Sequence, residues 1–423
     1  MNDDRQKFDR AAFLKRGATL AGTAALMGAA PATGSADAAK PLDIPASNKT
    51  LGVGVNDPPY GMPSKYERDI IRRTVPFLTA EEKSSVSFTP LQDLDGIITP
   101  SGVCFVRDHG GSPMTINPQR HRLVVHGLVD RPLEFTMDDL IRMPSQSAIY
   151  FMECGANGGM DYKGAQMQGV QFTHGMVHCC EWTGVKLSVL MDQVGVKPTA
   201  KWMLAEGADA AAMTRSVPIE KALDDAMIAW SQNGERLRPE NGYPLRLVLP
   251  GWQANLNIKW LRRLKFGSDP WETREETSKY TELLPDGKSR QFDWVMGTKS
   301  VITGPCPEKP MRARGFREVT GLAWSGFGKI ARVDVSFDGG VNWKPAALQE
   351  PVLTKALTRF RIPWEWNGET ALLQSRAVDD SGHVQPTQAQ LLAVRGGNAI
   401  YNRNAIHTWR VNANGSVDSV QVD

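Results

Sequence analysis

The sequence predicts an α+β fold in two domains, the second of them an Ig-like β-sandwich. Three observations support this prediction. The chain has 423 residues, more than one ordinary hydrophobic core requires. Up to about residue 300, strand and helix patterns alternate without the regular rhythm of a parallel βαβ protein. Beyond about residue 310, short strand patterns recur between turn sequences, as in a β-sandwich.

The N-terminus is typical of an export signal, which we place over residues 1–38. Basic residues precede a small, weakly apolar stretch, and Ala36-Asp37-Ala38 fits a cleavage site. The run from Asp9 to Lys15 is similar to a twin-arginine signal but lacks the second arginine, so a Sec-type signal or a disordered tail stays open. The apolar stretch is too short to leave a membrane span in the mature protein.

Local patterns predict the elements of each part. A Pro-, Gly- and Asp-rich segment over 41–95 is expected to wrap over the surface, with one helix near 64–75. In the first domain, placed over 96–300, Thr136 followed by two acids predicts a helix start. The expected strands lie at 122–127, 133–135, 245–250 and 301–303, and the expected short helices at 136–141, 185–194 and 218–226.

The second domain is placed over 301–423. Its strands are expected at 321–324, 331–336, 371–378 and 391–394, with turns at 338–340, 367–368 and 379–382. Trp324 is the expected core tryptophan of the sandwich.

Composition excludes several classes of protein. Hydrophobic residues make up 41% of the chain and charged residues 22%, as in soluble globular proteins. The net charge of +3 is weak, and the absence of a Lys/Arg-rich run argues against nucleic-acid binding. The five cysteines are odd in number and form no regular disulfide framework. The chain has no Cys-x-x-Cys-His motif, so it attaches no c-type haem itself.

Cys154 is the most informative residue. It ends the apolar stretch Tyr150-Phe151-Met152 and is followed at once by Gly155-Ala156. A buried thiolate supplies the charge and polarisability that a soft metal requires, and small neighbours let backbone amides approach a bulky cofactor. The alternative is a buried free cysteine that behaves as a small hydrophobe.

Three polar clusters accompany Cys154, each where a strand ends and a loop begins. They lie at 105–110, at 206–209 and at 241–246, the last continuing to Pro250-Gly251 and then to 257–260. Arginine and lysine that converge with asparagine and backbone amides suit an organic cofactor that carries a pyrophosphate.

With these clusters, the sequence resembles the sulfite oxidase family of molybdopterin enzymes, over both its cofactor domain and its Ig-like dimerisation domain. Several motifs in register carry the resemblance. The run from Phe105 to His109 is similar to the family's Phe-x-Arg-Asn-His, and the run from Cys154 to Asn157 to its Cys-Ala-Gly-Asn. Further matches lie at 207–209, 241–260 and, in the second domain, 334–343.

The resemblance implies a molybdenum–molybdopterin cofactor and a role for each matching residue. Cys154 is expected to ligate molybdenum, while Arg107 and Tyr280 face the substrate. Trp182 is expected to line the pocket. A second-domain arginine completes the family's site; Arg395 is the better match, and Arg403 stays open because the tail is longer here. The residues expected to hold the cofactor are Phe105, Arg107, His109, Cys154, Asp209, Asn241, Arg246, Asn257, Ile258 and Lys259.

Two departures from the family pattern bear on the substrate. Asn241 replaces a histidine that holds the pterin, which loses a titratable ring. Sulfite-specific members carry two arginines where this chain has Gly158-Gly159. A less cationic and wider pocket holds a small dianion less tightly and suits sulfur attached to a larger group. The resemblance therefore favours the sulfane dehydrogenase subgroup, which oxidises sulfane sulfur on a cysteine of a carrier protein.

The same resemblance implies the partners and the location. We expect a c-type cytochrome as electron acceptor, a sulfur-carrier protein as substrate donor, a homodimer through the second domain, and a periplasmic location. A sulfite dehydrogenase that passes electrons to cytochrome c is the main alternative. A secreted Ig-like binding module with a decayed cofactor site and a molybdopterin reductase also remain.

A zinc site is the rival interpretation of one segment. His174 and His178 are spaced one helical turn apart, and Cys179-Cys180 follow directly. No second motif supports such a site, so we expect these residues to be structural. His121, His126 and His383 are likewise expected to be structural or solvent-facing.

Overall fold

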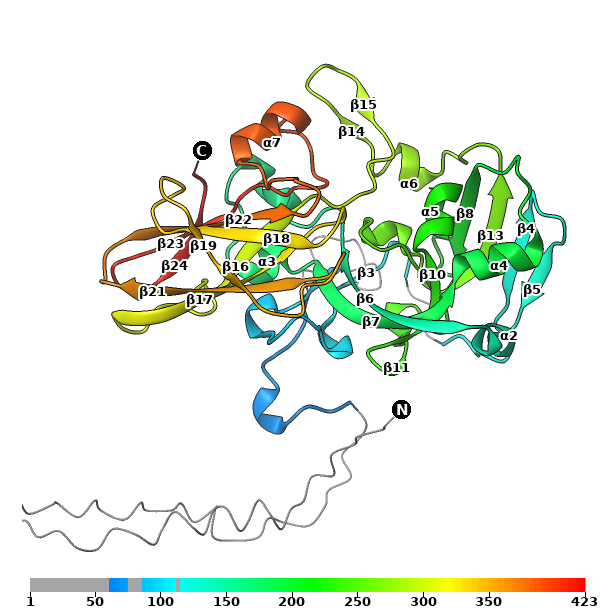
Figure 1. Ribbon diagram of the computed structural model, residues 1–423, viewed down its shortest axis with the longest axis horizontal. Coiled ribbons are helices and arrows are strands. Elements are labelled where there is room, and N and C mark those ends of the chain that lie inside the picture. Colours follow the sequence, from blue (N-terminus) through cyan, green and yellow to red (C-terminus); the bar gives the residue numbers. More distant parts are fainter. Residues whose placement is uncertain (1–60, 75–85, 112–114, 423) are drawn as a thin grey trace, which may run out of the picture. The chain divides into compact units, whose positions relative to one another are not determined.

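The computed structural model describes residues 61–74, 86–111 and 115–422 (Figure 1). The predicted export signal lies outside the described residues, and so do residues 41–60 and 75–85 of the predicted wrapping segment. Among the described residues, no helix combines the length and apolar character that crossing a bilayer requires.

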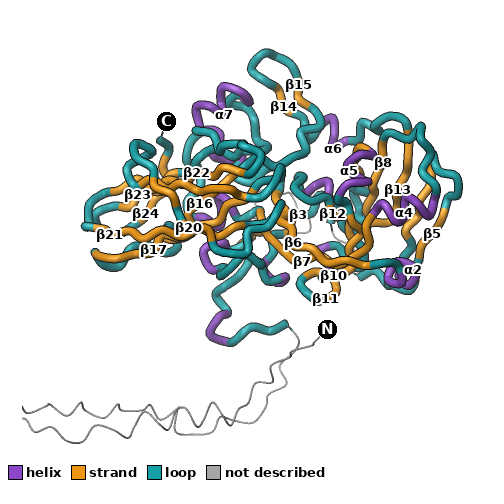
Figure 2. Tube along the Cα trace, viewed as in Figure 1, coloured by secondary structure: helices purple, strands orange, loops and turns teal. Residues whose placement is uncertain are grey.

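The first domain contains two five-stranded sheets (Figures 1 and 2). One has the order β5-β4-β13-β8-β9, in which β4 and β13 are parallel and the other pairs antiparallel. Its strands are β4 (Leu123–Gly127), β5 (Leu133–Phe135), β8 (Trp202–Gly207), β9 (Thr214–Pro218) and β13 (Leu261–Gly267). The short helices that accompany it are α2 (Met137–Arg142), α4 (Leu187–Val194) and α5 (Ile219–Asp224).

The other sheet has the order β11-β10-β7-β6, and β12 also pairs with β10. Its strands are β6 (Ser145–Glu153), β7 (Val177–Lys186), β10 (Met227–Gln232), β11 (Glu235–Arg236) and β12 (Arg246–Val248). The long pair β6–β7 ends at Glu153, which faces Val177 across the ladder. Cys154 follows directly, so this sheet fixes where the cysteine loop begins.

The second domain is a β-sandwich. One sheet has the order β16-β17-β21-β20 and the other β19-β18-β22-β23-β24. The first is built from β16 (Lys299–Gly304), β17 (Gly315–Trp324), β20 (Ala347–Leu348) and β21 (Thr358–Trp366). The second is built from β18 (Ile330–Ser336), β19 (Lys344–Pro345), β22 (Ala371–Asp379), β23 (Thr408–Val411) and β24 (Val417–Val420). Trp324 and Trp409 are fully buried between them.

Smaller elements connect these sheets. A three-stranded sheet joins the N-terminal segment to the first polar cluster, because β2 pairs with both β1 and β3. The smaller elements are β1 (Arg73–Thr74), β2 (Val86–Phe88), β3 (Val106–Arg107), α3 (Val170–His174), α6 (Arg274–Thr277), β14 (Glu282–Leu283), β15 (Ser289–Arg290) and α7 (Gln388–Arg395).

The predicted fold class is confirmed, and so are most of the predicted elements. The helix start at Thr136 is a capping box, in which the Thr136 hydroxyl accepts from the backbone of Asp139 and the Asp139 carboxylate accepts from the backbone of Thr136. The predicted helix over 185–194 begins only at Leu187, because Val185 and Lys186 still belong to β7.

Two predicted elements are wrong. The helix expected near 64–75 is a short 3-10 turn, Lys65–Glu67, followed by β1. The strand expected at 391–394 is the second half of helix α7. A run of four apolar residues fits either state. Thr387 and Gln390 decide it here, because they form a capping box that starts the helix.

The two domains meet at a buried ion pair. The Nζ atom of Lys299, on β16, lies 2.8 Å from the Glu153 carboxylate, and the two side chains are 1% and 0% exposed. Trp324 Nε1 donates to the same carboxylate at 2.7 Å, and Asn157 Nδ2 donates to it at 2.9 Å. Burial lowers the pKa of Lys299, while Glu153 opposes that shift. The residue before Cys154 is thus tied both to its own loop and to the second domain.

Lys299→Met tests the contribution of this pair. The variant leaves the Glu153 carboxylate buried without its cation, so we expect the free energy of unfolding to fall by about 3–5 kcal/mol. Urea unfolding followed by fluorescence measures the change. Lys288→Met is the control, because Lys288 pairs with Asp286 at the surface, where the side chains are 81% and 55% exposed. A loss no larger than that of the control would contradict the assignment.

The buried side chain of His407 makes the free energy of unfolding depend on pH. Its buried ring lies 5.0 Å from that of His174, and burial, with Arg403 and Lys299 nearby, lowers the pKa of His407 from 6.5 to about 3. The folded protein therefore keeps His407 neutral, while the unfolded chain binds a proton below its ordinary pKa. The free energy of unfolding should fall by about 1.4 kcal/mol per pH unit in that window through this residue.

Urea unfolding of the wild type and His407→Gln at about pH 7 and about pH 4.5 measures this slope. The variant should lose less stability on acidification. Equal losses in the two proteins would contradict the expectation.

Candidate functional site

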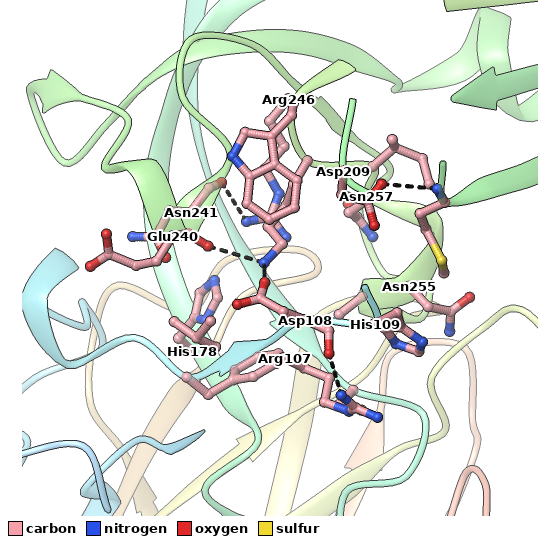
Figure 3. A pocket seen from close by; sticks show the side chains of 18 of the residues that line it. Arg107, Asp108, His109, His178, Asp209, Glu240, Asn241, Arg246, Asn255 and Asn257 are labelled. Atoms are coloured by element: carbon pink, nitrogen blue, oxygen red, sulfur yellow. Dashed lines mark hydrogen bonds and ion pairs between the residues drawn. The ribbon is translucent and has the colours of Figure 1, made fainter. Parts of the chain in front are cut away.

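A cavity lies in the first domain, among the segments that carry the predicted site residues (Figure 3). The structure brings eleven of those residues into its lining. They are Phe105, Arg107, His109, Cys154, Asp209, Asn241, Arg246, Asn257, Ile258, Lys259 and Tyr280. Residues spread from position 105 to position 280 therefore converge, as a binding site requires.

Each lining segment is held by backbone pairing just before or after the site. The run from Phe105 to His109 leaves β3, Cys154 follows β6, and Asp209 follows β8. The third cluster enters through β12 and leaves into β13. Asn257 braces this loop, since its side chain accepts from the Leu249 amide at 2.6 Å and donates to the Gln253 carbonyl at 3.0 Å.

Several buried donors at the cavity have no partner within the described protein. Arg246 donates through Nη1 to the Asn241 carbonyl at 2.9 Å, but its Nε has no hydrogen-bond partner. Neither Asn241 Nδ2 nor either ring nitrogen of His178 has one. Burial lowers the pKa of Arg246 to about 10, so it remains a cation at neutral pH. Unpaired buried donors beside a buried cation call for an anionic, acceptor-rich occupant.

Lys259 adds a second cation to the lining of the cavity. Its ammonium pairs with Asp108 and donates to the Glu240 carbonyl at 3.1 Å. The same nitrogen lies 4.4 Å from the centre of the Trp260 ring. These contacts fix the position of the ammonium. Because Asp108 balances the charge of Lys259, the positive charge of Arg246 remains unbalanced among these three side chains.

Cys154 is a free, buried thiol at the cavity wall. Its backbone is held by the Met176 carbonyl, which accepts from the Cys154 amide at 2.9 Å. Burial raises the pKa of Cys154, so the thiol keeps its proton until a cation replaces it. Soft metals bind such a sulfur in preference to oxygen ligands. The site residues thus fit a phosphate-bearing pterin together with a metal bound through sulfur.

Tyr280 and His109 form the polar end of the cavity. The Tyr280 hydroxyl and His109 Nε2 lie 3.2 Å apart, and the Arg215 guanidinium sits 5.2 Å from the centre of the Tyr280 ring. Burial raises the pKa of Tyr280 well above its ordinary value. Burial, followed by Arg107 and Lys259, lowers the pKa of His109 to about 3. At neutral pH both groups are therefore uncharged, and they share one hydrogen bond.

Three residues expected to line or complete the pocket are absent from its lining. Arg395 is not in the cavity lining; it pairs with Glu282 and Asp293, each at 2.7 Å. Arg403 is buried beneath Gly158, where its Nη2 donates to Gln388 at 3.0 Å while Nε and Nη1 are unpaired. Trp182 is fully buried behind the lining, with the Arg246 guanidinium 5.4 Å from its ring.

Sequence analysis missed other lining residues, among them Asp108, His178 and Asn255. Asp108 lies within the run from Phe105 to His109, so its place in that motif could have predicted that it lines the cavity. His178 was weighed only as a zinc ligand. Nothing in the sequence singled out Asn255, which accepts from Arg215 Nη1 at 2.6 Å.

The zinc interpretation does not hold for the four residues that suggested it. His174 ends helix α3, whereas His178 lies in strand β7, so the two are not one turn apart on a helix. A different group, Cys104, His178 and Cys180, comes together, with the two sulfurs 3.4 Å apart. Gln232 Nε2 lies 3.3 and 3.0 Å from these sulfurs and donates to both, as expected for a thiol pair in the core.

Gly158-Gly159 does not leave the open space that the sequence suggested. A Cβ atom on Gly159 would lie 2.3 Å from the Ile400 carbonyl oxygen. Backbone from the second domain therefore occupies the position where a side chain at 159 would project.

Comparisons with known proteins agree with this site. The family description "Oxidoreductase molybdopterin binding domain" matches residues 109–275, and "Mo-co oxidoreductase dimerisation domain" matches residues 290–409. The mitochondrial sulfite oxidase of Rattus norvegicus is 28% identical over 366 residues, 80% of this chain and 66% of that protein. The NADH nitrate reductase of Ulva prolifera is 30% identical over 359 residues, 74% of this chain and 41% of that protein. The chain thus spans less than two thirds of the length of these two relatives.

A solved structure, that of the sulfane dehydrogenase SoxCD from Paracoccus pantotrophus, is similar over a larger share. It is 49% identical with a TM-score of 0.88, over 90% of this chain and 98% of that chain. Together with the two matched domains and the cavity around Cys154, this similarity shows that the chain belongs to the sulfite oxidase family of molybdenum–molybdopterin oxidoreductases.

Proposed function

We propose that this protein is the molybdenum subunit of a periplasmic sulfane dehydrogenase. It oxidises sulfane sulfur carried on a cysteine of a carrier protein and passes the electrons to a partner c-type cytochrome. The observation that carries the proposal is the 49% identity with SoxCD over 98% of that chain, compared with 28% for the rat sulfite oxidase.

The cofactor would be held by the two sides of the cavity. Arg246, Lys259 and the unpaired Asn241 amide suit the phosphate and the polar edge of the pterin. Cys154 would supply the metal's protein ligand. When bound, the cofactor supplies two-electron oxidation of sulfur with transfer of an oxygen atom.

The protein's part in the reaction is orientation and electrostatic stabilisation. Arg107 lines the same cavity as Cys154 and carries a positive charge toward oxygens gained by the sulfur. The neutral Tyr280 hydroxyl offers a proton for a hydrogen bond to the same oxygens, and His109 fixes its direction at 3.2 Å. Neither group needs to change its protonation state for this role.

The absence of side chains at Gly158-Gly159 supports sulfane over free sulfite as substrate. No cation can project from position 159, because the Ile400 backbone occupies that space. A small dianion therefore lacks a charge-assisted contact from position 159 itself. A sulfite dehydrogenase with a cytochrome c acceptor is the second candidate, favoured by the sulfite oxidase relatives.

Location and assembly follow from the same proposal. The basic and weakly apolar N-terminus supports export to the periplasm, with the twin-arginine route as the proposed path. The match of residues 290–409 to a dimerisation domain supports a homodimer through the β-sandwich. The chain has no haem-attachment motif, so the proposed electron acceptor is a separate chain.

Arg246→Gln tests the assignment of the cofactor's anionic end. Removing a buried cation from a charge-assisted hydrogen bond should lower cofactor affinity about tenfold to a hundredfold. After dialysis, the molybdopterin content per chain is measured by the fluorescence of the oxidised pterin. Arg410→Gln is the control, since Arg410 pairs with Asp418 at the surface. Cofactor content equal to that of the control would contradict the assignment.

Steady-state kinetics with cytochrome c as acceptor test the proposed substrate. The purified protein is offered free sulfite and a carrier protein whose cysteine bears sulfane sulfur. We expect a higher kcat/KM for the carrier. Cys154→Ser should fold and yet turn over neither substrate, because oxygen-type ligands suit a soft metal poorly. A strong preference for free sulfite would make sulfite dehydrogenase the correct function.

A further inference from the structure

The segment between α7 and β23 returns from the second domain to the cysteine loop. The Asn402 amide donates to the Gly155 carbonyl at 2.6 Å, and the Ile400 carbonyl fills the space beside Gly159. Between these two contacts lies Tyr401, whose ring stacks on that of Tyr280 with centres 4.7 Å apart and planes 28° apart. The second-domain backbone over residues 400–402 thus places the Tyr401 ring against Tyr280, a residue of the cavity lining.

This segment is held in place from several directions. The Glu282 carboxylate accepts from the amides of Ile400 and Tyr401 at 3.3 and 2.9 Å. The Tyr162 hydroxyl donates to the Tyr401 carbonyl at 2.7 Å, and Gln253 Nε2 donates to Asn402 Oδ1 at 3.0 Å. Backbone groups on both sides of the Tyr401 side chain are therefore fixed, and its position is built into the fold.

We propose that Tyr401 determines substrate specificity, by forming with Tyr280 an aromatic wall for sulfur carried on an organic arm. This inference rests on the proposed function. Tyr401 is half-buried, and its ring lies against that of Tyr280, which lines the cavity. Aromatic rings attract polarizable sulfur and alkyl groups. They offer no charge to a free dianion, which distinguishes the two substrate classes.

The neighbouring charges agree with this role. The Arg215 guanidinium lies over the Tyr280 ring, but it is itself buried and lies 3.7 Å from the Glu276 carboxylate. Its charge is therefore balanced inside the protein. Arg395, the nearest cation on α7, is paired with Glu282 and Asp293. The ring faces of Tyr280 and Tyr401 thus present a polarizable surface without a charge of their own, while the Tyr280 hydroxyl and Arg107 remain the polar groups of the cavity beside it.

The test compares Tyr401→Ala with the wild type on free sulfite and on carrier-bound sulfane. We expect the ratio of the two kcat/KM values to shift about tenfold toward sulfite, the size of a lost sulfur–aromatic contact of about 1.4 kcal/mol. Tyr401→Phe, which keeps the ring, should recover most of the carrier activity. Tyr66→Ala is the matched control, because Tyr66 is 81% exposed and outside the site.

The outcomes separate this inference from the proposed function. Molybdopterin content and urea unfolding are measured for each variant, and Tyr401→Leu, which keeps apolar volume, replaces Tyr401→Ala if the latter does not fold. A wild type that prefers the carrier, with variants that leave the ratio unchanged, would overturn the role of Tyr401 alone. A wild type that prefers free sulfite would overturn the proposed function and this inference with it.

Discussion

The structure around the site depends on one buried carboxylate, that of Glu153. It ends strand β6, and it accepts hydrogen bonds from Asn157 in the cysteine loop and from Lys299 and Trp324 in the second domain. A charge with no solvent contact is stable only while every one of these partners is present. The position of Cys154, one residue further along, is therefore set by both domains together.

The same joint construction recurs on the other side of the cysteine loop. There, the Ile400 carbonyl of the second domain occupies the space beside Gly159, and the Asn402 amide donates to the Gly155 carbonyl. The first domain contributes the cations and hydrogen-bond donors that suit a phosphate-bearing cofactor. The second domain contributes the Ile400 backbone and the Tyr401 ring beside the cysteine loop.

Local signals in the sequence predicted most of the fold and the cavity lining. Capping at Thr136 and period-two strands are short-range features, and eleven of the expected site residues meet because their motifs lie at strand ends. Contacts between residues far apart in the sequence could not be predicted from these local signals. Arg395 belongs to a helix whose start depends on Thr387, and its partners Glu282 and Asp293 lie more than a hundred positions earlier. Gly159 suggested empty space because the chain that fills it, at Ile400, is 241 residues away.

Molybdenum K-edge X-ray absorption of the loaded protein tests the central claim, that the Cys154 sulfur binds the metal inside this two-domain frame. Cys154→Ser should reduce the sulfur shell around molybdenum by one atom, and Lys288→Met, a change at the surface, should leave it intact. An identical sulfur shell in the wild type and Cys154→Ser would contradict the account.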